Sequence, residues 1–237
     1  MRVSRLVALL AVALAFPLFG VAQAVIPVGQ FRSVELRNGG NVILRHGPVQ
    51  RVTIVTGDLR STQVRVAGGQ RLVIDNSGRE HRRGHKLQVE VITPGIGAVS
   101  VSNGGTLQTL GTFPGQTAIH AEVEQGGMID IRSIAADAVE ASVDSGGRIL
   151  TNPRNTLAAT VTSGGAITYW GDPRVEKSVR HGGVVVKGTP ADAGKPLSEL
   201  NPGLSPVPPV PRWRRFARTG TAACRRRNTS PGAREGA

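Results

Sequence analysis

Gly-Gly pairs recur along this chain at a spacing that suits stacked repeats. The pairs begin at Gly39, Gly68, Gly104, Gly126, Gly146, Gly164 and Gly182. The last five starting points are separated by 22, 20, 18 and 18 residues. A unit of about 20 residues is typical of one coil of a solenoid. The periodicity therefore predicts a long, shaped surface and indicates no particular reaction.

The residues on both sides of these pairs alternate between apolar and polar types. Around Gly126 the apolar positions are Ile119, Ala121, Val123, Ile129 and Ile131. The same register recurs around Gly39, Gly104, Gly146 and Gly164. A period of two is the pattern of half-buried strands, because a helix would need apolar residues every three or four positions. The sequence predicts an all-β, single-domain β-solenoid, β-helix-like, with about 18–22 residues per coil in its C-terminal half. The alternative is a set of ordinary hairpins with glycine loops.

The glycine pairs are interpreted as structural turns. A corner in a coiled sheet needs positive backbone dihedrals or a close approach between coils, and glycine supplies both. Stacked coils would then place glycine over glycine. The predicted turn residues are Gly39, Gly40, Gly104, Gly105, Gly126, Gly127, Gly146, Gly147, Gly164, Gly165, Gly182 and Gly183.

Two units depart from the register. After the Gly68 pair, Gln70 and Arg71 delay the following strand. Around Gly182, Lys177 and Lys187 occupy two inward positions. Charges there predict a terminal coil whose interior opens to solvent, as expected of a capping repeat.

Three segments are expected along the chain: a signal peptide at 1–24, the solenoid at 25–189, and a disordered tail at 190–237. The first has Arg2 and Arg5, an apolar run, and an A-x-A site that ends at Ala24. It predicts export to the periplasm or the cell surface after cleavage near Ala24. No later stretch has the length of a membrane helix. The single cysteine, Cys224, excludes an internal disulfide.

The net charge of +13 is concentrated in the tail. Residues 212–237 hold eight arginines and one glutamate, preceded by a Pro-rich spacer. The folded part is nearly balanced and lacks aromatic stacking platforms, so no nucleic-acid partner is expected. The tail is interpreted as a terminus without a specific role, as an element that contacts anionic surfaces, or as read-through of GC-rich sequence in a shifted frame.

One stretch resembles a known family. Gly165, Ile167, Tyr169, Gly171 and Pro173 match a Gly-x-Ile-x-Tyr-x-Gly-x-Pro element of the putative auto-transporter adhesin, head GIN domain family. The likeness covers roughly residues 29–188, but this chain has Gly-Gly where a Gly-x-Gly element is common. The resemblance implies a β-helix-like fold on an exported bacterial protein and an adhesive role. It implies no catalytic residue.

Candidate ligand-binding residues lie at outward positions of the predicted coils: Glu122, Glu124, Glu140 and Asp144, with the aromatic residues Tyr169 and Trp170. Stacking would place Glu124 over Asp144 and His120 over Glu140, roughly 4.8 Å apart. Such carboxylates suit a hard cation or an acid-base pair, but outward charges also keep a sheet soluble. Tyr169 is expected to fill the interior, and Trp170 to cover an end of the stack.

His81 and His85 have a spacing that can serve a metal on a helix. Gly84 and the surrounding cations indicate a loop instead, so no metal and no cofactor are expected.

The sequence as a whole favours an exported, non-enzymatic binding or adhesion module of the cell envelope, with a glycan or a surface protein as its ligand. One alternative is a polysaccharide-cleaving enzyme that uses the stacked carboxylates. The other is a structural scaffold of the envelope. The oligomeric state does not follow from the sequence.

Overall fold

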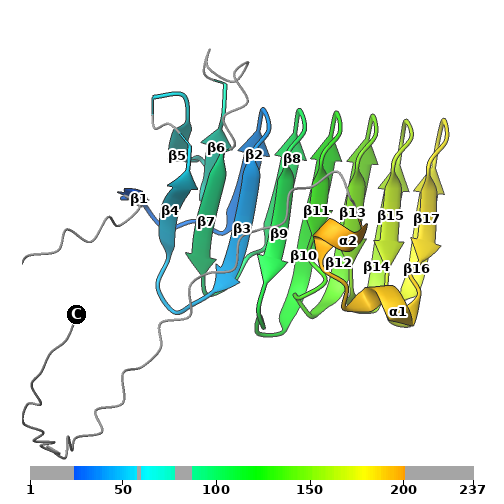
Figure 1. Cartoon of the computed structure of the whole chain (residues 1–237). Helices are drawn as coiled ribbons and strands as arrows, with labels where there is room; N and C mark the ends of the chain where they lie inside the picture. The colour runs from blue at the N-terminus through cyan, green and yellow to red at the C-terminus, as the bar shows by residue number, and fades with distance from the viewer. Residues whose placement is uncertain (1–23, 58–59, 78–86, 201–237) are drawn as a thin grey trace, which may run out of the picture.

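The computed structural model describes residues 24–57, 60–77 and 87–200, which form two facing β-sheets and two short helices (Figure 1). Sheet A contains, in spatial order, β1 (Ala24–Ile26), β4 (Arg51–Thr56), β7 (Gln88–Thr93), β3 (Asn41–His46), β9 (Thr106–Leu110), β11 (Met128–Asp130), β13 (Arg148–Thr151), β15 (Ala166–Tyr169) and β17 (Val184–Lys187). Sheet B contains β16 (Arg174–Val179), β14 (Pro153–Val161), β12 (Ala136–Asp144), β10 (Gln116–Glu124), β8 (Ala98–Ser102), β2 (Ser33–Arg37), β6 (Arg71–Asp75) and β5 (Gln63–Ala67). The helices are α1 (Pro190–Ala193) and α2 (Leu197–Leu200). The predicted all-β class is confirmed.

Strands one repeat apart lie side by side and run parallel. From β8 onward the chain alternates between sheet B and sheet A, with a Gly-Gly turn leading from each B strand to the next A strand. Ile119 faces Val139, and Val139 faces Leu157. These residues stand at the same distance before their glycine pairs, so the register that the pairs predict is the register of the sheet.

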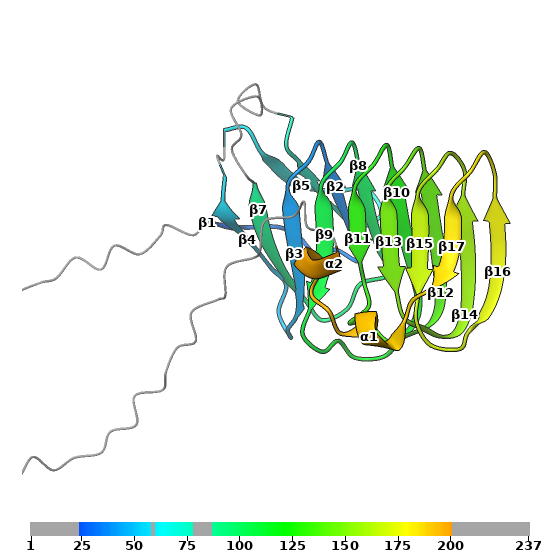
Figure 2. The same ribbon diagram turned by 45° about the vertical axis from the view of Figure 1, so that its right-hand side comes forward.

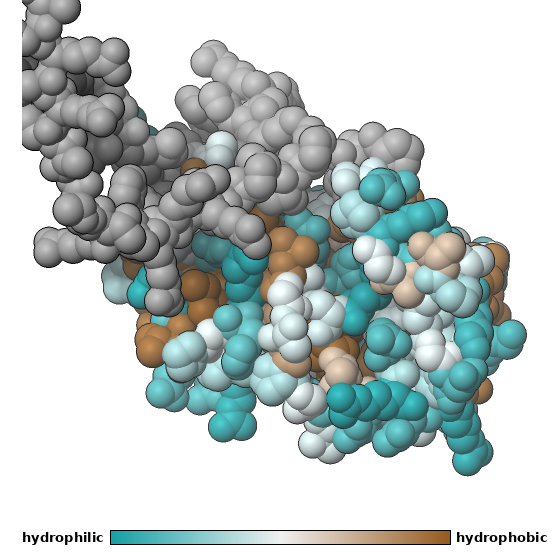
Figure 3. Space-filling model, turned by 60° about the horizontal axis from the view of Figure 1, so that its bottom comes forward, coloured by the Kyte–Doolittle hydropathy of each residue, from teal (hydrophilic) through white to brown (hydrophobic). Residues whose placement is uncertain are grey.

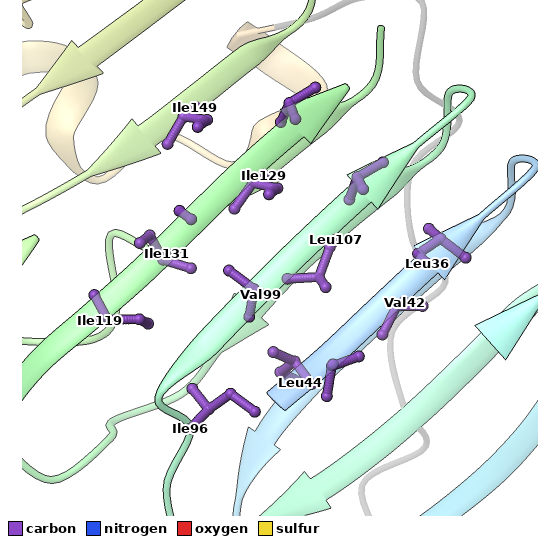
Figure 4. Packing of buried hydrophobic residues seen from close by; sticks show 14 of the residues in the cluster. Leu36, Val42, Leu44, Ile96, Val99, Leu107, Ile119, Ile129, Ile131 and Ile149 are labelled. Carbon is purple, nitrogen blue, oxygen red and sulfur yellow. The ribbon is translucent and has the colours of Figure 1, made fainter. Parts of the chain in front are cut away.

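The space between the sheets is filled by aliphatic side chains (Figure 4). The five inward positions around Gly126, which are Ile119, Ala121, Val123, Ile129 and Ile131, are each no more than 2% exposed. Each buried aliphatic side chain stabilises the fold by about 1.5–3 kcal/mol. The alternation in the sequence therefore identifies the core of the domain.

The two glycines of each pair have different reasons to be glycine. Gly146 has a φ of +89°, but a Cβ there would meet no atom within 4 Å. Gly147 has a φ of +106°, and a Cβ there would lie 2.9 Å from the carbonyl oxygen of Gly127. The first glycine is needed for backbone conformation, whereas the second also allows neighbouring repeats to approach. The glycine pairs of these neighbouring repeats are therefore stacked on one another, as predicted.

The Gly68 pair forms a different kind of turn. It joins β5 to β6 within sheet B as an antiparallel hairpin. The sequence signals this unit as an exception, and the hairpin is the physical reason. Strands β1, β4 and β5 all pair antiparallel at this end of the molecule, so the first repeats are closed by strands of opposite direction.

The opposite end of the stack ends in β16 and β17. Lys177 and Lys187 occupy inward positions there and are exposed, and Val175 is half-buried. Inward charges on edge strands discourage pairing with another sheet. The interior is therefore open to solvent at these last strands, as expected.

Residues 190–200 differ from the expectation of disorder from Pro190 onward. They form α1 and α2, which lie against the outer side of sheet A (Figure 2). Leu197 is 5% exposed in a cluster with Met128, Leu150 and Trp170. Apolar contacts with the sheet order this segment, which its Pro-rich composition does not reveal. Residues 1–23 and 201–237, and with them most of the expected signal and tail, lie outside the described residues.

Candidate functional site

The predicted carboxylates all lie on the outer face of sheet B. Glu124 stands opposite Asp144, and His120 opposite Glu140, as the register predicts. Glu122 lies between Ser100 and Ser142 on the neighbouring strands. Glu124, Glu140 and Asp144 are exposed, and Glu122 is half-buried. Because paired strands lie about 4.8 Å apart, Glu124 and Asp144 form one acidic area beside the Gly-Gly turns, while Glu140 lies further along the same face, opposite His120.

His120 and Glu140 belong to a shallow groove on the same face. Nδ1 of His120 lies 3.3 Å from a carboxylate oxygen of Glu140. The groove has a volume of about 470 Å³ and crosses β10, β12, β14 and β16. Its floor is made by Ala118, Ala138 and Ala158. Small side chains in the floor let a flat or extended ligand approach the sheet, with polar groups beside it.

The two aromatic candidates are not brought together at the surface. Tyr169 is half-buried and packs against the inner core, as expected. Trp170 is 6% exposed on the outer side of sheet A, where its Nε1 donates to the carbonyl oxygen of Thr189 at 2.8 Å. Trp170 therefore does not cover an end of the stack, because α2 covers Trp170 instead. A sugar-stacking patch of both rings is not formed.

Arg132 fastens α1 to sheet A, a role that no pattern in the sequence indicates. Its Nε and Nη2 donate to the Asp130 carboxylate at 2.9 and 2.7 Å. Its remaining donors reach the carbonyl oxygens of Asp192, Ala193 and Lys195, at 2.9–3.1 Å. The guanidinium also lies 5.2 Å from the centre of the Trp170 ring. Arg132 thus helps to hold the strap, by which we mean residues 189–200, through charge-assisted bonds.

The loops at the lower ends of the strands contain a second hollow, of about 710 Å³. Gln50 closes part of it, since its amide donates to the Phe31 carbonyl oxygen at 2.6 Å and accepts from Phe31 N–H at 3.1 Å. Figure 3 looks at this lower side and shows apolar atoms interspersed with hydrophilic ones. The hollow depends on loops that are far apart in the sequence, so no local motif predicts it.

Metal chemistry finds no support in the described part of the chain. No group of three or more His, Cys, Asp or Glu side chains is placed there to hold an ion. His81 and His85 lie outside the described residues. The clear electrostatic effects belong to structural pairs: a hydrogen bond from Lys187 lowers the pKa of Asp172, and hydrogen bonds from Lys195 and Thr189 lower the pKa of Asp192.

A protein-family model matches residues 30–119 and 114–173, which is more than half of the chain. It describes the family "Putative auto-transporter adhesin, head GIN domain". The chain belongs to the head GIN family. The match includes the glycine-paired strands up to Pro173, and the strap lies beyond it. No curated protein matches the chain.

Several solved structures resemble this head GIN chain over most of their own length. A putative adhesin from Parabacteroides merdae has 12% identity, covers 71% of this chain and 96% of its own, and has a TM-score of 0.33. A putative adhesin from Bacteroides fragilis has 18% identity, with coverage of 70% and 94% and a TM-score of 0.35. A putative cell adhesion protein from Clostridium sporogenes has 9% identity, with coverage of 70% and 98% and a TM-score of 0.34. TM-scores of this size carry no argument about fold or ligand. Within residues 24–57, 60–77 and 87–200, no helix is long and apolar enough to cross a membrane.

Proposed function

We propose that this chain is an exported, non-enzymatic adhesion module of the bacterial cell envelope, built as a β-solenoid. Membership of the head GIN family supports an adhesive role. The parallel register of β8 to β17 supports a solenoid, since each repeat adds one strand to each sheet. In this proposal residues 1–24 direct export and are removed near Ala24.

The outer face of sheet B is the ligand-binding face in this proposal. The observation that carries it is the position of four carboxylates on one outer face beside a shallow groove. The strap lies against the outer side of the other sheet, sheet A (Figure 2). An envelope glycan or a protein surface fits the outer face of sheet B, because carboxylates accept hydrogen bonds from hydroxyl and amide groups. In this proposal Glu124 and Asp144 contact the ligand most directly.

Binding to envelope fractions and to a glycan array tests this proposal. The double variant Glu124→Gln, Asp144→Asn should lose most of the binding, since it keeps the shape and removes the charge. Asp172→Asn is the matched control, because this exposed carboxylate lies near β15 on the other sheet. Equal binding by both variants would refute the proposed face.

The same reagents distinguish the alternatives. Cleavage of an acidic polysaccharide that disappears in the double variant would identify an enzyme and overturn the non-enzymatic proposal. Affinity capture of one envelope protein, without glycan binding, would favour a structural scaffold.

A further inference from the structure

Beyond the strap, the outer face of sheet A carries three aliphatic side chains among polar ones. Leu110 on β9 and Ile92 on β7 both stand opposite Arg45, and Ile43 lies two residues before Arg45 on the same face of β3. The Arg45 guanidinium bonds the Glu90 carboxylate at 2.7 Å, so the charges on this face are paired. This surface, which we call the β9–β7 face, adjoins the place where α2 ends.

Two outward side chains of this face are as well covered as core residues. Ile43 is 3% exposed and Gln108 is 6% exposed. Their inward neighbours Val42 and Leu107 are fully buried, as expected. Helix α2, however, packs on Met128 and Leu150, which belong to β11 and β13. The cluster that contains α2 therefore includes no residue of β3 or β9.

The chain itself offers a suitable cover. Arg148 on β13 donates to the carbonyl oxygen of Leu200 at 3.4 Å, so the described chain ends over sheet A next to β11 and β9. The eleven following residues, 201–211, carry no charge and contain five prolines. Leu204, Val207 and Val210 recur every third residue among them.

The spacing of these three residues matches the sheet. A polyproline II segment has three residues per turn and rises about 3.1 Å per residue, so every third side chain recurs after about 9 Å. Two strand spacings amount to about 9.6 Å. If the segment crosses the strands at right angles, Leu204, Val207 and Val210 would thus each lie over a strand, with one strand between consecutive contacts. Proline lacks an N–H group, which lowers the cost of covering the segment's backbone.

We propose that residues 201–211 dock in cis on the β9–β7 face, with Leu204, Val207 and Val210 directed at the sheet. The strap and this segment together close the outer side of sheet A. The inference does not depend on the proposed adhesive function.

Thiol labelling of the full chain tests the docking. In a Cys224→Ser background, Gln108→Cys places one reporter thiol on the β9–β7 face. A second chain adds Leu204→Asp, Val207→Asp and Val210→Asp. Labelling of residue 108, followed by intact mass, should be about tenfold faster in the second chain, because the docked segment must otherwise leave first. Ser142→Cys on the outer face of sheet B is the matched control and should react equally in both chains.

Equal labelling rates at residue 108 in the two chains would overturn the proposal, since the cover would then be local side chains. Labelling of residue 108 that becomes slower as the protein concentration rises would also overturn the proposal, because the covering segment would then come from a second copy of the chain. A second reporter thiol, Glu90→Cys on β7, should show the same difference in labelling rate between the two chains as residue 108.

Discussion

Gly147 lies directly against the main chain of Gly127. The carbonyl oxygen of Gly127 accepts a hydrogen bond from Arg148 N–H at 3.0 Å, which leaves no room for a side chain at residue 147. Gly165 repeats the contact with Gly147, and Gly183 repeats it with Gly165. From the Gly104 pair onward, the second glycine of each pair therefore sets how closely the repeats stack.

Alanine substitutions within one pair should separate backbone conformation from stacking. Gly146→Ala and Gly147→Ala both place a Cβ at positive φ, which costs about 1–2 kcal/mol. Gly147→Ala also forces a Cβ against Val123 and Gly127, so we expect a further loss of about 1–3 kcal/mol. Urea unfolding of the two variants measures the difference. Equal free energies of unfolding would show that stacking does not require the second glycine.

Loss of the Arg132 side chain should release the strap. Arg132→Ala removes the charge-assisted bonds to the carbonyl oxygens of Asp192, Ala193 and Lys195 and leaves Asp130 without its partner. In a Trp213→Phe background, the emission of Trp170 should shift to longer wavelength as the ring becomes exposed. The strand signal in circular dichroism should persist, because the inner core is untouched.

Arg154→Ala is the control for the strap experiment. Arg154 forms only a loose, exposed pair with Asp137 at 3.8 Å on sheet B. Trp170 emission should be the same as in the parent. If Arg132→Ala also left the emission unchanged, the strap would be held by its apolar contacts alone.

The strap should also loosen in acid. A hydrogen bond from Lys195, and a second one from Thr189, lower the pKa of Asp192 in the folded chain. A carboxyl with a lowered pKa stabilises the folded state fully above its ordinary pKa of about 3.9, and this contribution is lost as the pH falls through the lowered value. Trp170 emission followed below about pH 4 should reveal the release. In Asp192→Asn this part of the transition should be absent, and an unchanged curve would contradict the assignment.

The terminal lysines should limit self-association. Lys177 and Lys187 point inward on the last strands, where a further repeat would otherwise add. Lys177→Val with Lys187→Val should raise the apparent mass in light scattering as concentration increases. The matched pair Lys177→Arg, Lys187→Arg keeps the charge and should behave like the parent. Association by the arginine pair as well would mean that charge is not the cause.

The core and the register were predictable because they depend on local alternation. A residue such as Val123 is inward because of its distance from Gly126, and parallel pairing of the strands then repeats that choice in every repeat. The same logic placed Glu124 opposite Asp144. It also identified the Gly68 unit as irregular, although the antiparallel pairing of β5 with β6 depends on partners that the local pattern does not specify.

The strap was not predictable for the opposite reason. Trp170 is buried because Leu197 reaches it from another part of the chain, and Arg132 is half-buried because carbonyl groups near α1 lie around its guanidinium. Neither Leu197 nor Arg132 belongs to a periodic pattern. Contacts of this kind follow from the path of the chain after β17, which a repeat register does not describe.

We propose that the outer face of sheet B carries the adhesive function. The most direct measurement compares envelope binding by two charge-removal variants in the same assay. The first variant alters the sheet B face and carries four substitutions: Glu122→Gln, Glu124→Gln, Glu140→Gln and Asp144→Asn. The second variant alters the sheet A side and carries Glu90→Gln and Asp172→Asn. We expect the first variant to lose binding and the second to retain it. Full binding by the first variant, with a correctly folded core, would show that the outer face of sheet B does not bind the ligand.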